Sequence, residues 1–233
     1  MRGILFDKDG TLLDFEATWT PVLKRLALQA AGGDPDRAAR LLDEGGLDAK
    51  TGKVRAGSVI GAGTNALIVE LWHPDLSGAE LAQAIVDMDR AALEHGSQHS
   101  VPIPGALDAL ATLSARGIVM GVATNDGTAA ARAALAATGM AAHLPHVFGY
   151  DSVTRSKPAP DMVLAFAREA GIAPADVAVV GDNPHDMEMA RAAGATAIGV
   201  TSGNSSADDL APLADVVLPS VAALPEWLDA NAT

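Results

Sequence analysis

The fold is decided by the stretch GILFDKDGTL at residues 3–12, where a short apolar run ends abruptly at a charged turn. Residues 3–6 are too few for a helix, so this run predicts a buried β-strand. Asp7 and Asp9 then follow the carboxyl end of that strand, and residues 10–11 predict a turn. Ligands of parallel sheets bind at the carboxyl ends of the strands, so the two aspartates mark a candidate site.

Beyond this stretch, short apolar runs alternate with helical patterns. We expect strands at residues 118–123, 147–148, 177–180, 195–200 and 216–218, and helices at 105–115, 128–138, 160–170 and 185–193. Continuous apolar strands alternating with helices are typical of a parallel sheet covered on both faces. The predicted fold is therefore α/β, a doubly wound, Rossmann-like parallel sheet.

Residues 16–101 interrupt this alternation with helical periodicity. Helices are expected from about residue 16 to 31 and at 35–45, 64–71 and 78–94, whereas residues 47–63 are rich in glycine and polar residues and predict no regular element. We therefore expect an α/β catalytic core formed by residues 1–15 and 102–233. A mostly α-helical cap domain, residues 16–101, is inserted after the first strand.

The composition excludes several classes of protein. The chain has no cysteine, so disulfides, thiol catalysis and zinc–thiolate sites are ruled out. Its formal net charge is −13, without a run of Lys or Arg, which argues against a nucleic-acid partner or an anionic membrane surface. It also lacks an apolar run of the roughly 18–20 residues that cross a bilayer. Charge appears within the first seven residues, so we expect no signal peptide. We expect a cytoplasmic monomer or homodimer.

Polar residues of related kinds follow the predicted strands. They are Asp7 and Asp9 after the first, Thr124 and Asn125 after the second, Lys157 after the third, and Asp182 and Asp186 after the fourth. Clustered carboxylates without His or Cys select a hard cation, and Mg²⁺ suits them best because it also binds substrate phosphate. A carboxylate can accept a phosphoryl group, and a second carboxyl can protonate the leaving oxygen. The pattern therefore predicts phosphoryl transfer.

Four motifs carry a resemblance to a known family. They are DKDGTL at residues 7–12, TN at 124–125, KP at 157–158 and GDNPHD at 181–186. Their order and strand context resemble those of the haloacid dehalogenase-like (HAD) hydrolase superfamily, over roughly residues 1–15 and 102–220. The cap position is most similar to that of phosphoglycolate phosphatase-like enzymes. The resemblance implies a Mg²⁺-dependent phosphatase acting on a small phosphorylated metabolite through an aspartyl-phosphate, with 2-phosphoglycolate as the substrate suggested by analogy.

The resemblance also implies roles in catalysis and phosphate binding. Asp7 would be the nucleophile and Asp9 the general acid/base. Lys157 would neutralise the nucleophile and the phosphoryl group. The Thr124 hydroxyl and the Asn125 amide would bind phosphate oxygens.

A metal site is implied by the same resemblance. Mg²⁺ would be held by Asp7, the backbone carbonyl of Asp9 and Asp182, with Asp186 in a supporting position. His185 lies inside the last motif, where the residue type varies, and receives no catalytic role.

Other functions are weighed against this one. A sugar phosphomutase of the same fold stays open, since it would return the phosphate to a sugar rather than to water. Dehalogenation is disfavoured because a departing halide needs no acid, whereas Asp9 is present. A non-catalytic phospho-accepting module, like a response-regulator receiver, is about half this length and orders its acidic residues differently.

Some features of the predicted cap receive simpler interpretations. Lys50, Lys53 and Arg55 form a small basic cluster, which we interpret as solvated surface. The alternative is that one of them meets a distal anionic group of the substrate when the cap closes. Residues 57–63 are interpreted as a flexible glycine-rich segment. Trp19 is expected in the core or at an interface rather than in recognition.

Overall fold

Six short strands form one parallel sheet in the order β3-β2-β1-β4-β5-β6 in the computed structural model, which describes residues 1–48 and 50–231. The strands are β1 Gly3–Phe6, β2 Val119–Ala123, β3 His146–Phe148, β4 Val177–Gly181, β5 Thr196–Val200 and β6 Val216–Leu218. Every neighbouring pair of strands is parallel. The predicted doubly wound α/β fold is confirmed.

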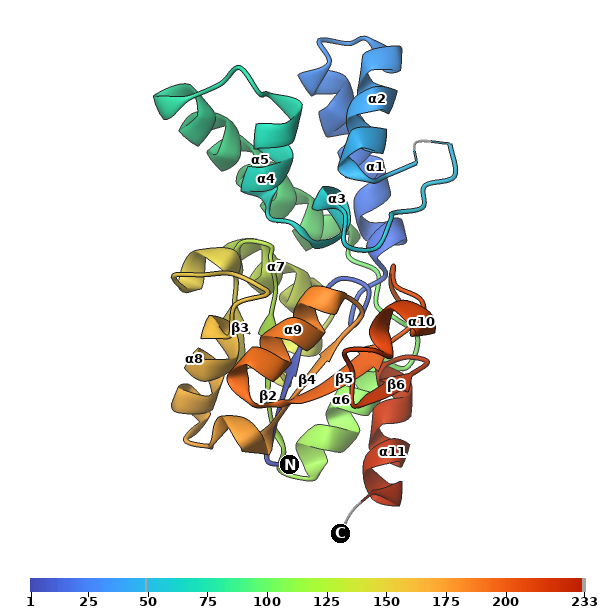
Figure 1. The fold of residues 1–233 in the computed structure, drawn as a ribbon, viewed down its shortest axis with the longest axis vertical. Coiled ribbons are helices and arrows are strands. Elements are labelled where there is room, and N and C mark those ends of the chain that lie inside the picture. The colour runs from blue at the N-terminus through green and yellow to red at the C-terminus, as the bar shows by residue number, and fades with distance from the viewer. Residues whose placement is uncertain (49, 232–233) are drawn as a thin grey trace.

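Helices cover both faces of this sheet (Figure 1). They are α6 Ala106–Ala115, α7 Thr128–Ala137, α8 Asp161–Ala170, α9 Pro184–Ala193, α10 Ala207–Leu210 and α11 Leu224–Ala230, with short 3₁₀ turns at Met140–Ala142, Tyr150–Ser152, Pro174–Asp176 and Val221–Ala223. Ile4 and Phe6 of β1 pack with α6, α7 and α11, while Leu5 between them packs with α8 and α9 on the other face. This alternation follows from the two-residue period of a strand.

Five helices lie between β1 and α6, above the sheet in Figure 1. They are α1 Phe15–Ala30, α2 Pro35–Gly45, α3 Val59–Ala62, α4 Asn65–Trp72 and α5 Gly78–His99, and we call them the helical insertion. They enclose a hydrophobic cluster of their own, in which Trp72 is almost fully buried. Helix α5 also packs against α7 of the core.

Four helices differ from the sequence prediction. Helix α5 continues to His99, five residues past its expected end, and α3 lies within the glycine-rich stretch predicted to lack regular structure. Helices α10 and α11 were not expected. Helix α10 has only four residues and is fixed by a capping box between Ser206 and Asp209. Such short helices hold too few turns for periodicity to reveal them.

The chain passes between the core and the helical insertion through two adjacent segments. The Asp14 N–H donates to the Val101 carbonyl at 2.8 Å, and the Ile103 N–H donates to the Leu12 carbonyl at 2.9 Å. The Val101 N–H also donates to the Thr18 hydroxyl at 3.1 Å. Hydrogen bonds therefore join the segment that leaves the core to the segment that returns to it.

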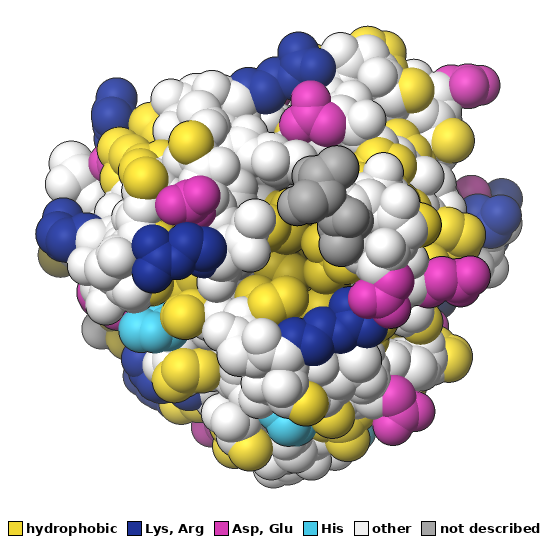
Figure 2. All heavy atoms as spheres, turned by 90° about the horizontal axis from the view of Figure 1, so that it is seen from below, with side chains coloured by type: hydrophobic (Ala, Val, Ile, Leu, Met, Phe, Trp, Pro, Cys, Tyr) yellow, Lys and Arg dark blue, Asp and Glu magenta, His cyan; other side chains and the backbone are white. Residues whose placement is uncertain are grey.

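The opposite end of the core has a different surface. Figure 2 shows this end with apolar side chains at the floor of a hollow and with basic and acidic side chains scattered around it. A hollow at the amino ends of the strands is lined by Met1, Ile118, Trp227 and Leu228, among others. Within the described part of the chain, no helix combines the length and apolar character that crossing a bilayer requires.

Trp72→Ala should destabilise the protein by about 3–5 kcal/mol, because it leaves a large cavity in the insertion. Trp72 is 1% exposed, and its indole N–H donates to the Leu41 carbonyl at 3.1 Å. The change therefore also leaves that carbonyl without this hydrogen bond. Urea unfolding measures the effect. Leu67→Ala on the same helix, where the side chain is 47% exposed, is the control and should change stability by under about 1 kcal/mol. Equal effects of the two changes would contradict this packing.

Candidate active site

Strand register brings the first and fourth motifs together. Strands β1 and β4 are neighbours, with Phe6 opposite Val180, so the residues that follow them emerge side by side. The Asp7 N–H donates to the Val180 carbonyl at 2.7 Å, which continues the ladder by one residue. Asp182 follows the end of β4 and therefore lies beside Asp7.

Three carboxylates meet at this edge of the sheet. Ligand oxygens of Asp7, Asp182 and Asp186 all lie within 4.8 Å of one another, and all three residues are buried. Lys157, from the loop after β3, places its Nζ 2.6 Å from Asp7 Oδ1 and 2.6 Å from Asp186 Oδ1. One buried ammonium thus bridges two of three buried carboxylates.

The excess of negative charge appears in the pKa values. Burial raises the pKa of Asp7 to about 7, although the ammonium of Lys157 opposes the rise. Burial, together with the charges of Asp7 and Asp186, raises the pKa of Asp182 well above its usual range. Burial also disfavours the charged form of Lys157, yet Asp186 and Asp7 outweigh it and raise the pKa of that amine. The cluster therefore favours taking up a proton or a cation.

Backbone packed closely around Asp182 fixes the position of its carboxylate. A Cβ at Gly10, whose φ is +85°, would come within 2.5 Å of the Asp182 side chain, and a Cβ at Gly203 within 1.9 Å. The Asn204 N–H donates to Asp182 Oδ2 at 2.9 Å. Only glycine permits this approach from two sides, so Asp182 is held in a cradle of backbone.

Asp186 has a different position from the other two carboxylates. Its Oδ2 accepts from the Asn183 N–H at 3.1 Å, as part of the capping box that begins α9, and its Oδ1 accepts from Lys157. Both oxygens are therefore engaged within the protein. Buried carboxylate oxygens without His or Cys suit a hard divalent cation, so the residues present fit such an ion. Asp7 and Asp182 suit direct ligation of such a cation, whereas Asp186, with both oxygens engaged, suits a supporting position beside it.

Asp9 is held by a residue of the insertion and by a buried lysine. Its Oδ1 accepts from the Trp19 Nε1–H at 2.8 Å, and its Oδ2 pairs with the Lys8 ammonium. Lys8 is fully buried and also lies 3.4 Å from Asp126 Oδ2. Burial opposes the charge on Lys8, but Asp9 and Asp126 outweigh it and raise the pKa of the amine. Trp19 packs against the hydrophobic cluster of the insertion, as expected for a core or interface residue, and it also contacts Asp9 and lines the cavity.

The second motif contributes at the end of β2. The Thr124 hydroxyl oxygen accepts from the Asp126 N–H at 3.1 Å, which leaves its proton free to donate. The Asn125 side chain donates to the Ala62 carbonyl of the insertion at 2.7 Å. The Asn125 side chain therefore bridges the core and the insertion.

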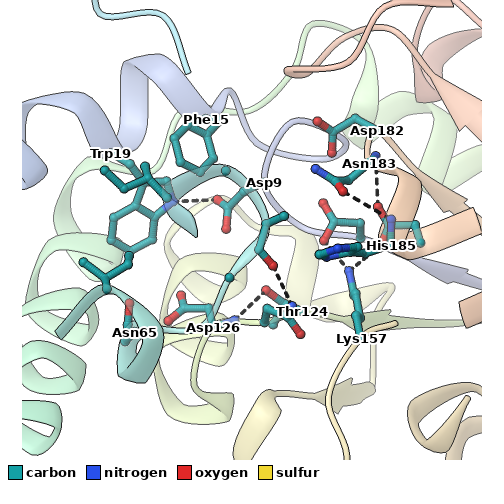
Figure 3. A pocket seen from close by; sticks show the side chains of 18 of the residues that line it. Asp9, Phe15, Trp19, Asn65, Thr124, Asp126, Lys157, Asp182, Asn183 and His185 are labelled. Atoms are coloured by element: carbon teal, nitrogen blue, oxygen red, sulfur yellow. Dashed lines mark hydrogen bonds and ion pairs between the residues drawn. The ribbon is translucent and has the colours of Figure 1, made fainter. Parts of the chain in front are cut away.

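A cavity of about 680 Å³, partly open to solvent, lies between the sheet edge and the insertion. Its lining includes every residue predicted for the site: Asp7, Asp9, Thr124, Asn125, Lys157, Asp182 and Asp186. Figure 3 shows Phe15 and Trp19 on one side of it, Asp182 and Asn183 on the other, and Asp9 between them.

Other lining residues were not found from the sequence. Asp126 follows the second motif and His185 lies inside the fourth, so their closeness to these motifs was the sequence signal that could have found them. Asn65 and residues 60–63 come from the insertion, where no motif marks them. Within the stretch 57–63, interpreted as a flexible segment, residues 59–62 form α3 and residues 60–63 line the cavity.

The basic cluster of the insertion lies away from the cavity. Lys50, Lys53 and Arg55 are exposed, and Arg55 pairs with Asp43 at 2.9 Å. None of the three lines the cavity. This exposure agrees with the interpretation as solvated surface, and the alternative contact with a distal substrate anion in a closed cap stays a prediction.

Comparison with known proteins identifies the family. The family model described as haloacid dehalogenase-like hydrolase matches residues 1–194. The chain belongs to the haloacid dehalogenase-like hydrolases. It is 31% identical over 212 residues to the phosphoglycolate phosphatase of Shigella boydii serotype 4 (strain Sb227), covering 87% of this chain and 82% of that one. It is 41% identical over 107 residues, 46% of each chain, to the protein of Dickeya dadantii (strain 3937) named "Probable phosphatase IndB".

Solved structures of this hydrolase family share the fold. A haloacid dehalogenase-like hydrolase from Bacteroides fragilis superposes with a TM-score of 0.77 at 21% identity, over 96% of this chain and 99% of that one. The resemblance inferred from the four motifs is confirmed, and so is the expectation of a hydrolase.

Mg²⁺ should raise the melting temperature of this hydrolase more at pH 8 than at pH 5. The raised pKa of Asp7 means that the folded state keeps a proton that the unfolded state loses above about pH 4. The stability provided by that proton is lost as the pH rises through about 7, and a cation then takes its place. At one hundred times its Kd, Mg²⁺ would add about 2.7 kcal/mol, or several degrees.

Thermal unfolding with and without Mg²⁺ at both pH values measures this gain. Asp182→Asn should remove most of it, whereas Asp208→Asn, an exposed acidic residue of α10, should keep it. An equal gain at pH 5 and pH 8, or a full gain in Asp182→Asn, would contradict the assignment.

Proposed function

We propose that this hydrolase is a Mg²⁺-dependent phosphatase that acts on a small phosphorylated metabolite through a phosphoaspartate on Asp7. The observation that supports it most is the clamp of Lys157 on Asp7 and Asp186, with Asp9 in the same cavity. A nucleophilic carboxylate, a second carboxyl group and a fixed cation are the groups that phosphoryl transfer requires.

The first chemical step forms the phosphoaspartate. An Asp7 carboxylate oxygen attacks phosphorus, and the bond between phosphorus and the ester oxygen breaks. Asp9 donates its proton to that oxygen, so the substrate alcohol leaves neutral. Lys157 stabilises the charge on Asp7 and on the phosphoryl oxygens, while the Thr124 hydroxyl donates to a phosphoryl oxygen.

The second step regenerates the enzyme. Asp9, now ionised, takes a proton from water, whose oxygen attacks phosphorus, and the bond from phosphorus to Asp7 breaks to release inorganic phosphate. The backbone amide of Asn125 would hold a phosphoryl oxygen in both steps. Asp7, the Asp9 carbonyl and Asp182 would hold Mg²⁺, with Asp186 in support; the ion would neutralise charge on the phosphoryl oxygens.

The helical insertion serves as the cap of this enzyme, with residues 16–101 over a catalytic core of 1–15 and 102–233. Trp19 and the contact of Asn125 with Ala62 support this division, because both connect the insertion to the reaction centre. Such a cap excludes bulk water while Asp7 attacks. The Shigella boydii relative is a phosphoglycolate phosphatase, so 2-phosphoglycolate belongs in any panel of substrates.

Asp7→Asn should abolish phosphate release from a panel of phosphorylated metabolites in the presence of Mg²⁺, because an amide cannot act as the nucleophile. Inorganic phosphate is measured over time, with Asp208→Asn as the matched control that keeps wild-type activity. More than a few per cent of activity in a folded Asp7→Asn variant would refute the nucleophile. Transfer of phosphate to a second sugar without release of phosphate would indicate a phosphomutase instead.

Asp9→Asn should slow phosphoryl transfer from alkyl phosphates by about 10²–10⁴-fold, since the leaving oxygen loses its proton donor. 4-Nitrophenyl phosphate, whose leaving group needs no proton, should still give a burst of about one nitrophenol per enzyme before turnover stalls at hydrolysis. Rapid-mixing absorbance measures the burst. Loss of the burst, or equal slowing of both kinds of ester, would remove Asp9 as the acid.

A further inference from the structure

The wall that the helical insertion presents to the cavity is apolar. Its side chains are Phe15, Trp19, Leu23, Ile60, Ala62 and Ile68. The insertion adds one polar side chain, Asn65, whose amide nitrogen donates one hydrogen bond to Asp89 at 2.9 Å. Among residues 1–48 and 50–231, no Lys or Arg of the insertion lines the cavity.

This wall begins next to the acid of the reaction. The Trp19 Nε1–H donates to Asp9 at 2.8 Å, so the indole lies beside the carboxyl group that would protonate the departing oxygen. The Lys8 ammonium lies 5.1 Å from the centre of the Trp19 ring and fixes it further. Phe15 lies next to Trp19 on the same side (Figure 3). Whatever group leaves toward Asp9 therefore meets aromatic surface.

The charges around the wall disfavour a second anion on the substrate. Asp9 and Asp126 both line the cavity, and both belong to the Lys8 network. Lys8 is fully buried behind them, and Lys157 is committed to Asp7 and Asp186. A carboxylate or second phosphate held against the wall of the insertion would meet no Lys or Arg there and would lie near the acidic groups of Asp9 and Asp126.

We infer that the substrate is a phosphomonoester whose leaving alcohol is uncharged and presents apolar surface beside the ester oxygen. The inference rests on the proposed function and narrows it, because it separates this enzyme from its phosphoglycolate phosphatase relative by substrate. Apolar burial against Phe15, Trp19 and Ile68 provides the attraction. An anionic leaving group would lie beside Asp9 and Asp126 without a basic residue of the wall to pair with, and this disfavours anionic substrates.

A matched pair of esters tests this selectivity. 2-Hydroxyethyl phosphate and 2-phosphoglycolate have the same length but end in a hydroxyl and a carboxylate, respectively. The expected kcat/KM with Mg²⁺ is at least about tenfold higher for the neutral ester. Benzyl phosphate adds apolar surface, so its kcat/KM should exceed that of both two-carbon esters. The carboxylate of 4-carboxybenzyl phosphate should remove this gain in kcat/KM.

Phe15 offers a pair of variants that isolates charge. Phe15→Lys and Phe15→Met place side chains of similar length on the wall, one cationic and one neutral. Relative to Phe15→Met, the lysine variant should shift selectivity toward 2-phosphoglycolate by about tenfold. If Phe15→Lys does not fold, the wild-type selectivity between the matched esters still decides the question.

The outcomes separate the two proposals. If the enzyme releases phosphate and its kcat/KM for 2-phosphoglycolate equals or exceeds that for 2-hydroxyethyl phosphate, the inference is overturned. The proposed phosphatase activity is then still supported. No phosphate from any of the four esters, from folded enzyme with Mg²⁺, would overturn both. Preference for the neutral members of both pairs would support the inference.

Discussion

The ion pair that Lys157 makes with Asp7 and Asp186 is the interaction on which the site depends. Three carboxylates this close and this buried repel one another strongly, and an unpaired buried charge is costly. Two contacts of 2.6 Å from one ammonium keep the cluster together. The remaining negative charge attracts a proton or a cation. The same excess of negative charge suits the site to the divalent ion and the phosphoryl group of the proposed function.

The sheet supplies the geometry that this pairing needs. Because β1 and β4 are adjacent and parallel, Asp7 and Asp182 follow strand ends that differ by more than 170 positions in the chain yet emerge together. Backbone at Gly10 and Gly203 then closes around the Asp182 carboxylate, where a larger residue would collide. Rigid strands and tight glycine contacts allow the carboxylates little freedom, which suits groups that must be positioned before reaction.

Motifs at strand ends were predictable because their chemistry is local, whereas the cavity wall was not. The six strands and all the proposed site residues were found from apolar runs and the polar residues after them. Lys8 lies between the two aspartates of the first motif, yet one of its acidic partners, Asp126, is over one hundred residues away in the chain. Residues 57–63 carry no periodicity, so the sequence hides both α3 and its contact with the cavity. Strand order and the position of Trp19 likewise depend on contacts that only the folded chain creates.

The paired connection between the core and the helical insertion has an evolutionary consequence. Because the Asp14–Val101 and Ile103–Leu12 hydrogen bonds join the outgoing and returning chain, the core meets the insertion as a closed loop with neighbouring ends. An insertion of another length or shape could replace it at little entropic cost, since loop closure depends weakly on length. Selection could therefore exchange the wall that meets the leaving group while the carboxylates and Lys157 stay in place, and new substrates could arise without rebuilding the chemistry.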